Sequence, residues 1–274
     1  MAFQVPRPRM LPAELSPLLP AGVGAIRSVE RIKHGLTNDS WRVISEHDDL
    51  VVRRGNASES SLQIDRDSEA RVLIVVAQAG LGPEVVVNAR DKRLLVTRYA
   101  GATWTASQAL ELGNIDRIAA TFARLHALLI PDGVHRVDLR SAVRAYIASL
   151  SEHDTAWNLR APALEARATH IVETLRRNAP ECLCHNDVHA LNIVDDGALR
   201  LIDWEYAGIG DRYFDLASLC VYHTYDRQRR QRLLSSYLQG MDGEAYRLLE
   251  LACWLFEYVR DLWIAVRESA GSRD

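Results

Sequence analysis

The sequence predicts an α+β protein in two lobes, with a small sheet-rich lobe at residues 26–99 and a larger helical lobe at residues 100–274. Apolar residues of the first lobe fall in short runs between turn-forming residues, whereas after Gly101 they recur at helical steps of three and four. The chain has 274 residues, 48% hydrophobic and 25% charged, which suits a folded protein with a sizeable core. Residues 1–25 are punctuated by prolines and are expected to form an irregular N-terminal arm.

The first lobe is expected to run strand, strand, strand, helix, strand, strand. The strands are predicted at residues 26–34, 40–45, 50–54, 84–88 and 93–99. The helix is predicted at residues 61–79, where Gly80 and Pro83 supply its end.

The second lobe is expected to be built from helices around a short strand-rich stretch. Helices are predicted at residues 115–129, 139–151 and 163–177 and again near the C-terminus, and strands at 182–185, 192–194 and 199–203. Asn114 is expected to be the N-cap of the first of these helices. The order of the elements implies a cleft between the lobes, with residues 97–101 as the connector.

Charge and cysteine usage exclude several classes of protein. A net charge of -3 provides no field that would attract nucleic acid. The longest apolar run, at residues 72–77, is far below the roughly 18 residues of a membrane span. The 4 cysteines show no C-x-x-C spacing and no disulfide framework, which favours a reducing cytoplasm. We therefore expect a cytoplasmic protein without nucleic-acid or membrane partners, and the sequence leaves its oligomeric state open.

The most informative stretch lies at residues 182–208. It places His185, Asp187 and Asn192 in the order H-x-D-x-x-x-x-N, and Asp203 follows an apolar strand. Phosphoryl transfer needs a carboxylate to accept the proton of the attacking hydroxyl and oxygen ligands for Mg²⁺. The spacing from Asp187 to Asn192 equals that of the protein-kinase catalytic loop. Taken singly, either residue is more typical of a turn.

A zinc site is the alternative for this stretch. His185 and His189 are four residues apart, but Asp187 does not directly follow His185 as the glutamate of an H-E-x-x-H motif would. The spacing therefore disfavours zinc.

These motifs resemble the aminoglycoside phosphotransferase and choline kinase family, whose members are small-molecule kinases with a protein-kinase-like fold. HNDVHALN and IDWEYAG are most similar to its choline, ethanolamine and thiamine kinase branch, and KHGLTNDSWRV and GDRYFDLASL extend the likeness over about residues 26–270. The resemblance implies ATP- and Mg²⁺-dependent transfer of the γ-phosphoryl group to a small-molecule hydroxyl. It implies that Asp187 and His185 are catalytic residues, with Asp187 as the base. It also implies that Asn192, Asp203 and Glu205 are metal ligands.

The nucleotide loop differs from that of protein kinases because the sequence has no G-x-G-x-x-G. Gly35, Thr37 and Asn38 are the candidates to contact phosphate, since glycine allows a close backbone approach and the other two offer polar groups. An ordinary hairpin turn is the alternative. In the connector, Thr97 and Tyr99 are expected to line the nucleotide site.

The phosphate-pairing base of the third strand is expected to be Arg53, because the only lysines, Lys33 and Lys92, lie elsewhere. Arginine contacts phosphate with two donors, whereas lysine makes a point contact. Its helix partner is expected to be Glu69, with Asp65 or Asp67 as alternatives.

Three residues are assigned supporting roles by resemblance. Asp215 ties the catalytic loop to the following helix, Asp211 caps that helix, and His126 serves packing and hydrogen bonding.

The acceptor is expected to be choline or ethanolamine, ahead of thiamine and then of an aminoglycoside or other sugar. A quaternary ammonium binds aromatic faces and a carboxylate, and the residues proposed to contact it are Asp187, Tyr222, Glu257 and Trp263. The same aromatic residues suit a helix core. A catalytically silent binding module of the same fold is the hypothesis from a different class, and the presence of Asp187, Asn192 and Asp203 disfavours it.

Overall fold

The computed structural model describes residues 12, 15–20, 22–32, 38–55, 64–151, 155–240 and 242–271. The chain forms two compact units. The first, here called the sheet unit, comprises Met1–Thr103 with Ile193–Tyr206, and the second, here called the helical unit, comprises Trp104–Asn192 with Ala207–Asp274. Residues 193–206 thus belong to the sheet unit, whereas the sequence assigns them to the lobe at 100–274.

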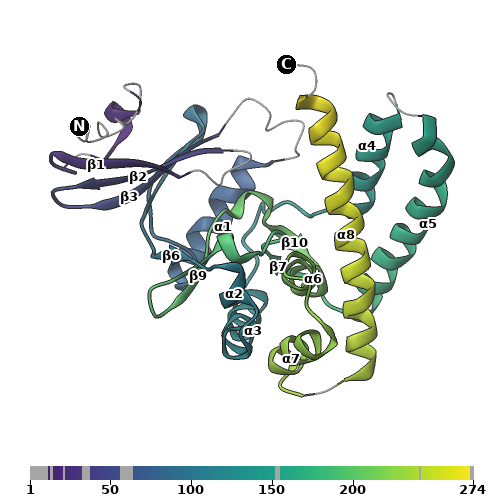
Figure 1. The fold of residues 1–274 in the computed structure, drawn as a ribbon. Coiled ribbons are helices and arrows are strands. Elements are labelled where there is room, and N and C mark those ends of the chain that lie inside the picture. The colour runs from purple at the N-terminus through teal and green to yellow at the C-terminus, as the bar shows by residue number, and fades with distance from the viewer. Residues whose placement is uncertain are drawn as a thin grey trace, which may run out of the picture. The chain divides into compact units, whose positions relative to one another are not determined.

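The sheet unit contains a five-stranded antiparallel sheet in the order β1-β2-β3-β5-β4 (Figure 1). Its strands are β1 (Ile26–Ile32), β2 (Asn38–Ser45), β3 (Asp49–Gly55), β4 (Val85–Ala89) and β5 (Leu94–Arg98). Alternate residues of β3 face a hydrophobic core, where Leu50 and Val52 are fully buried. Leu15 and Val23, from the expected irregular arm, complete this core.

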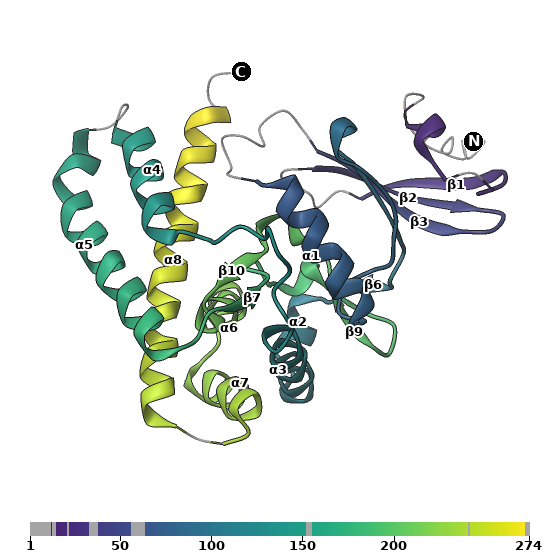
Figure 2. The same ribbon diagram turned by 180° about the vertical axis from the view of Figure 1, so that it is seen from behind.

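Helix α1 (Arg66–Gln78) belongs to the same unit (Figure 2). It packs against β4. It begins at Asp65, whose side chain accepts hydrogen bonds from the amides of Asp67 and Ser68. The helix was expected from residue 61, and residues 61–63 lie outside the described part of the chain. Glu69 lies on the buried face of α1, which brings a carboxylate into the interior of the unit.

A small second sheet joins the sheet unit from far along the sequence. It consists of β6 (Ala102–Thr103), β8 (Ile193–Asp195) and β9 (Leu199–Leu201), followed by the 3-10 turn η5 (Trp204–Tyr206). Leu201 N donates to Leu81 O over 2.8 Å, and Trp204 is almost fully buried beside Gly82. These contacts fix the residues that follow β9 near the end of α1.

The helical unit is built around a long C-terminal helix. Its helices are α2 (Ala106–Ala109), α3 (Leu112–His126), α4 (Leu139–Ser151), α5 (Thr155–Asn178), α6 (Arg212–Tyr222), α7 (Arg227–Leu238) and α8 (Gly243–Gly271), and its strands are β7 (Cys182–Cys184) and β10 (Gly208–Gly210). Helix α8, in yellow in Figure 1, contacts α4, α5 and α6, while α3 packs on α7. None of the helices in the described residues has the length and apolar character needed to cross a membrane.

Two helix starts were predicted wrongly. Helix α5 begins at Thr155, whereas the sequence predicts residue 163. The N-cap of α3 is Glu111 rather than Asn114, whose side-chain nitrogen donates to Gln108 O and Glu111 Oε2. Asn114 therefore braces the first turn from inside the helix. Helix α2, which begins with a capping box between Thr105 and Gln108, was not expected because four residues are too few to show a helical period.

Candidate active site

Arg53 joins two carboxylates of the sheet unit. Its Nη2 donates to Glu69 Oε1 over 2.5 Å, and its Nη1 donates to Asp203 Oδ1 over 3.0 Å. The side chain of Arg53 is 13% exposed, that of Glu69 4% and that of Asp203 33%. The predicted pairing of Arg53 with Glu69 is thus present, and Asp203 is the most accessible of the three groups.

Mutual electrostatic stabilisation keeps Arg53 and Glu69 charged. Burial lowers the pKa of Arg53, but Glu69 and Asp203 raise it by more, and the net pKa lies above its usual value. Burial raises the pKa of Glu69, but Arg53 and Arg66 lower it by more, and the net pKa lies below its usual value. The pair is therefore ionised at neutral pH.

Asp203 lies at a turn that its neighbours hold in place. It follows β9 and adopts a left-handed backbone conformation with φ of 64°, which aspartate tolerates better than most residues. The next residue, Trp204, is anchored by its indole N–H, which donates to Leu201 O over 2.8 Å. This turn directs the Asp203 carboxylate toward Arg53.

A second group of polar side chains contacts Glu69 through Arg66. Asn38 Nδ2 donates to Glu205 Oε2 over 2.7 Å, and Arg66 Nη2 lies 3.2 Å from the same oxygen. Arg66 also donates to Glu69 Oε2 over 2.7 Å and to Asn38 Oδ1 over 3.1 Å. Glu205 is only 2% exposed, and it neutralises Arg66. The roles of Glu205 as a metal ligand and of Asn38 as a phosphate contact remain predictions.

The remaining nucleotide residues divide into two sets. Gly35 and Thr37 lie outside the described residues. Thr97 is buried in β5, and Tyr99 lies with its ring 3.6 Å from the guanidinium carbon of Arg42. Thr97 and Tyr99 therefore remain predictions as nucleotide contacts.

In the helical unit, the loop after β7 is held by α6. The amides of His185 and Asn186 donate to the two carboxylate oxygens of Asp215 over 2.9 and 2.6 Å. Val188 N donates to Ser218 Oγ over 3.2 Å. Asp215 is fully buried, and its predicted role as the tie between loop and helix is confirmed.

This loop presents the carboxylate of Asp187 among three side chains. Tyr222 Oη donates to Asp187 Oδ1 over 2.8 Å. Asn192 Nδ2 donates to the backbone oxygen of Asp187 over 2.8 Å and lies 3.4 Å from its Oδ2. His189 Nε2 lies 3.8 Å from the same Oδ2. Asp187 and Asn192 are therefore brought together as predicted.

The histidines of the loop are supporting groups. His185 is fully buried, and its Nδ1 accepts a hydrogen bond from Asp187 N over 3.4 Å. Burial lowers the pKa of His189 to about 4, and burial together with His189 lowers that of His223 to about 4. His223 Nε2 accepts from Ala190 N over 3.0 Å, so both His189 and His223 are neutral at pH 7.

The predicted acceptor residues of α8 have arginine neighbours. Glu257 is exposed and lies 3.9 Å from Arg260 Nη2. The guanidinium carbon of Arg267 lies 5.2 Å from the centre of the Trp263 ring, so a cation of the chain itself already faces this ring. Of the predicted acceptor residues, Tyr222 touches Asp187 directly.

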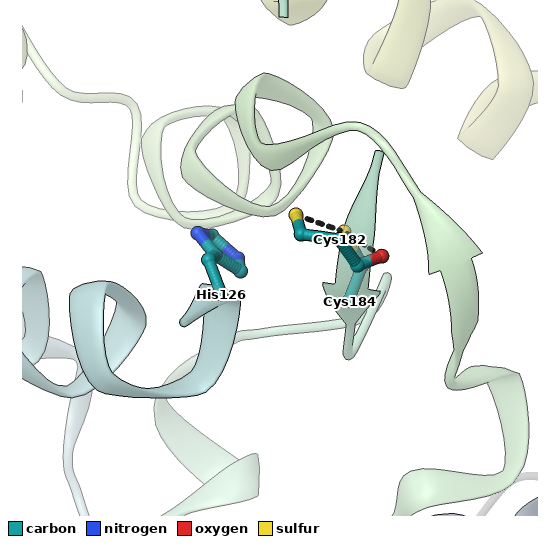
Figure 3. Close-up of side chains that lie close together, drawn as sticks. All are labelled: His126, Cys182 and Cys184. Atoms are coloured by element: carbon teal, nitrogen blue, oxygen red, sulfur yellow. Dashed lines mark hydrogen bonds between the residues drawn. The ribbon is translucent and has the colours of Figure 1, made fainter. Parts of the chain in front are cut away.

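Three residues of types that bind metals lie close together in the helical unit. His126, Cys182 and Cys184 offer atoms within 4.8 Å of one another (Figure 3). However, His126 pairs through Nε2 with Asp215 Oδ2 over 3.0 Å and through Nδ1 with Tyr237 Oη over 2.9 Å. Burial raises the pKa of Cys184 well above its usual value, so it is a thiol rather than a thiolate. The cluster is therefore part of the core, as expected for His126.

Two features of the site were not predicted from the sequence. Arg66, which links Glu69, Glu205 and Asn38, resembles any polar residue at a helix start. The bond from Tyr222 to Asp187 joins residues 35 positions apart. No local pattern reports such a contact.

A comparison with known families agrees with this geometry. A family model described as the phosphotransferase enzyme family matches residues 28–250. The chain belongs to the phosphotransferase enzyme family. The predicted family is thereby confirmed.

Relatives of the chain include small-molecule kinases. Ethanolamine kinase 2 from Mus musculus is 25% identical over 237 residues, which cover 79% of the chain and 61% of that relative. The chain thus spans less than two thirds of the length of ethanolamine kinase 2. Protein LicA from Haemophilus influenzae is 26% identical over 249 residues, covering 86% of the chain and 73% of LicA.

A solved structure with a similar fold is that of choline kinase LicA from Streptococcus pneumoniae. It matches with a TM-score of 0.76 at 21% identity, covering 94% of this chain and 89% of the other. The predicted protein-kinase-like fold of the chain is confirmed.

Proposed function

We propose that the protein is an ATP- and Mg²⁺-dependent kinase that transfers a γ-phosphoryl group to the hydroxyl of a small molecule. The observation that carries this proposal is the bridge of Arg53 between Glu69 and Asp203. Such a bridge places a guanidinium able to contact phosphate beside a carboxylate able to bind metal. Membership of a phosphotransferase family supports the same reaction class.

The charges of the sheet unit fit a divalent cation. Glu69, Asp203 and Glu205 present three carboxylates to the two guanidinium groups of Arg53 and Arg66. These five side chains carry one net negative charge, which a bound cation would offset.

Oxygen ligands for Mg²⁺ are proposed to come from Asp203 and Asn192. Because Asn192 Nδ2 donates to Asp187, the amide oxygen is the atom that Asn192 offers to a cation. Both ligands are hard oxygen donors, as Mg²⁺ prefers. When bound, Mg²⁺ neutralises charge on the phosphate oxygens.

Asp187 is proposed to accept the proton of the acceptor hydroxyl. The hydroxyl oxygen forms a bond to the γ-phosphorus of ATP, and the bond between the γ-phosphorus and the bridging oxygen breaks, so that ADP leaves. The carboxylate is 25% exposed, so it is accessible to a substrate while its loop is held by α6. Arg53 is proposed to orient the phosphates of ATP. Neither role needs His185, whose ring supports the turn.

The acceptor is proposed to be ethanolamine or choline, because similar proteins carry these names. Thiamine and aminoglycosides or other sugars are the alternatives. The test incubates purified protein with ATP, Mg²⁺ and each of choline, ethanolamine, thiamine and kanamycin, and records ADP and phosphorylated product by ³¹P NMR. Stoichiometric ADP and phospho-ethanolamine or phosphocholine are expected. Formation of phosphokanamycin alone would overturn the assignment of ethanolamine or choline as the acceptor. Absence of ATP-dependent product from every acceptor would count against the kinase reaction.

A further inference from the structure

The hydroxyl of Tyr222 contacts the carboxylate of Asp187, and this contact has a function of its own. Resting on the proposed kinase function, we propose that Tyr222 is a positioning residue that sets the rotation of the Asp187 carboxylate and leaves Oδ2 to receive the acceptor proton. The bond from Tyr222 Oη to Asp187 Oδ1 measures 2.8 Å. Tyr222 is the last residue of α6, so it approaches Asp187 from an element that also anchors the loop.

The backbone of the loop does not need Tyr222. Asp215 accepts from the amides on the N-terminal side of Asp187, and Ser218 accepts from Val188 N. Asn192 donates to the carbonyl of Asp187 itself. With the main chain fixed in this way, the freedom that remains is rotation of the Asp187 side chain.

The contacts of the two carboxylate oxygens are unequal. Oδ1 accepts from Tyr222 at 2.8 Å, whereas Oδ2 has Asn192 Nδ2 at 3.4 Å and His189 Nε2 at 3.8 Å. Hydrogen bonds weaken with length, and the bond from Tyr222 is the shortest of these three contacts. A base must be held within hydrogen-bond reach of the proton that it removes.

The ring of Tyr222 is itself well placed to act as a restraint. It packs edge-to-face with His189 and with Phe256 of α8, at centroid distances of 4.8 and 5.4 Å. Burial and the neighbouring Asp187 raise the pKa of Tyr222, so the hydroxyl stays protonated and donates throughout the range of an enzyme assay.

The test compares Tyr222→Phe with Tyr225→Phe, which removes a hydroxyl that donates to Ala109 O. In Tyr222→Phe we expect kcat to fall about tenfold, with the KM for ATP and the melting temperature nearly unchanged. Tyr225→Phe should lower the melting temperature and leave kcat nearly unchanged.

An unchanged kcat in Tyr222→Phe, with wild-type activity intact, would overturn the role of Tyr222 alone. A lower melting temperature with an unchanged kcat would make Tyr222 a packing residue and would equally overturn the proposal. A wild-type protein that turns over none of the acceptors would instead refute the kinase function on which the proposal rests.

Discussion

Arg53 and Asp203 are joined by a 3.0 Å hydrogen bond from Nη1 to Oδ1, although they lie 150 positions apart in the chain. The same guanidinium holds Glu69 of α1 through Nη2. One side chain of β3 therefore links a helix of the sheet unit to the turn after β9. Arg53 can perform both tasks because its donors are arranged as a rigid fork.

Replacing this fork by a single ammonium should weaken the nucleotide site. In Arg53→Lys we expect the apparent KM for ATP to rise about tenfold while the KM for the acceptor stays nearly constant. The control is Arg54→Lys, because adjacent strand residues point to opposite faces and Arg54 is exposed. An equal apparent KM for ATP in both variants would show that Arg53 does not contact the nucleotide.

The metal assignment predicts a changed requirement for Mg²⁺. Asp203→Asn and Asn192→Ala should each raise the Mg²⁺ concentration for half-maximal activity, by about tenfold. The matched control is Asp196→Asn, since Asp196 is exposed and pairs with Arg200 over 2.8 Å. Titration of Mg²⁺ at saturating ATP measures this. Superimposable curves for Asp203→Asn and the wild type would contradict the role of Asp203.

The regular elements of the fold were largely predictable because each has its own periodic pattern. Helix α4 spans Leu139–Ser151, the predicted range, and its buried residues recur at helical spacing. Strand β9 begins at Leu199 as predicted but ends at Leu201 rather than at residue 203. It stops early because Asp203 takes a left-handed conformation, which ends the ladder.

Contacts within the site were predictable only where a motif reports them. The pairing of Arg53 with Glu69 and the tie from Asp215 to the loop follow from family motifs. Capture of Glu205 by Asn38 and Arg66 depends on how β2 and α1 converge on η5. Sequence spacing contains no information on that convergence, which explains why these two partners of Glu205 were not predicted.

Two buried histidines predict a loss of stability on mild acidification. His189 and His223 have pKa values lowered from 6.5 to about 4. Between these values the unfolded chain binds more protons than the folded chain, so stability rises with pH across this window and falls on acidification. We expect a lower melting temperature at pH 5 than at pH 7, with the difference reduced by about half in His189→Gln.

The control for this prediction is His170→Gln, which changes an exposed histidine of α5. Its difference between the two pH values should equal that of the wild type. A full wild-type difference in His189→Gln would show that His189 does not titrate in this window.

Substitution of Trp263 tests whether this residue contacts the acceptor or belongs to the hydrophobic core. If it contacts the acceptor, Trp263→Ala should raise the acceptor KM about fivefold with a small change in melting temperature. The comparison is Trp254→Ala, because Trp254 stacks on Tyr258 at 5.3 Å and faces Arg167 at 4.0 Å. That variant should mainly lose stability. A large drop in melting temperature with an unchanged KM would assign Trp263 to the core as well.

The central claim is that Asp187 is the base of a phosphoryl transfer, and Asp187→Asn tests it most directly. Asparagine keeps the shape of the side chain but cannot accept the proton as a carboxylate does. Single-turnover measurement of product formation, with ATP affinity measured in parallel, should give a rate lower by about 100-fold or more at unchanged ATP affinity. A rate within about twofold of the wild type would contradict the assignment of Asp187 as the base.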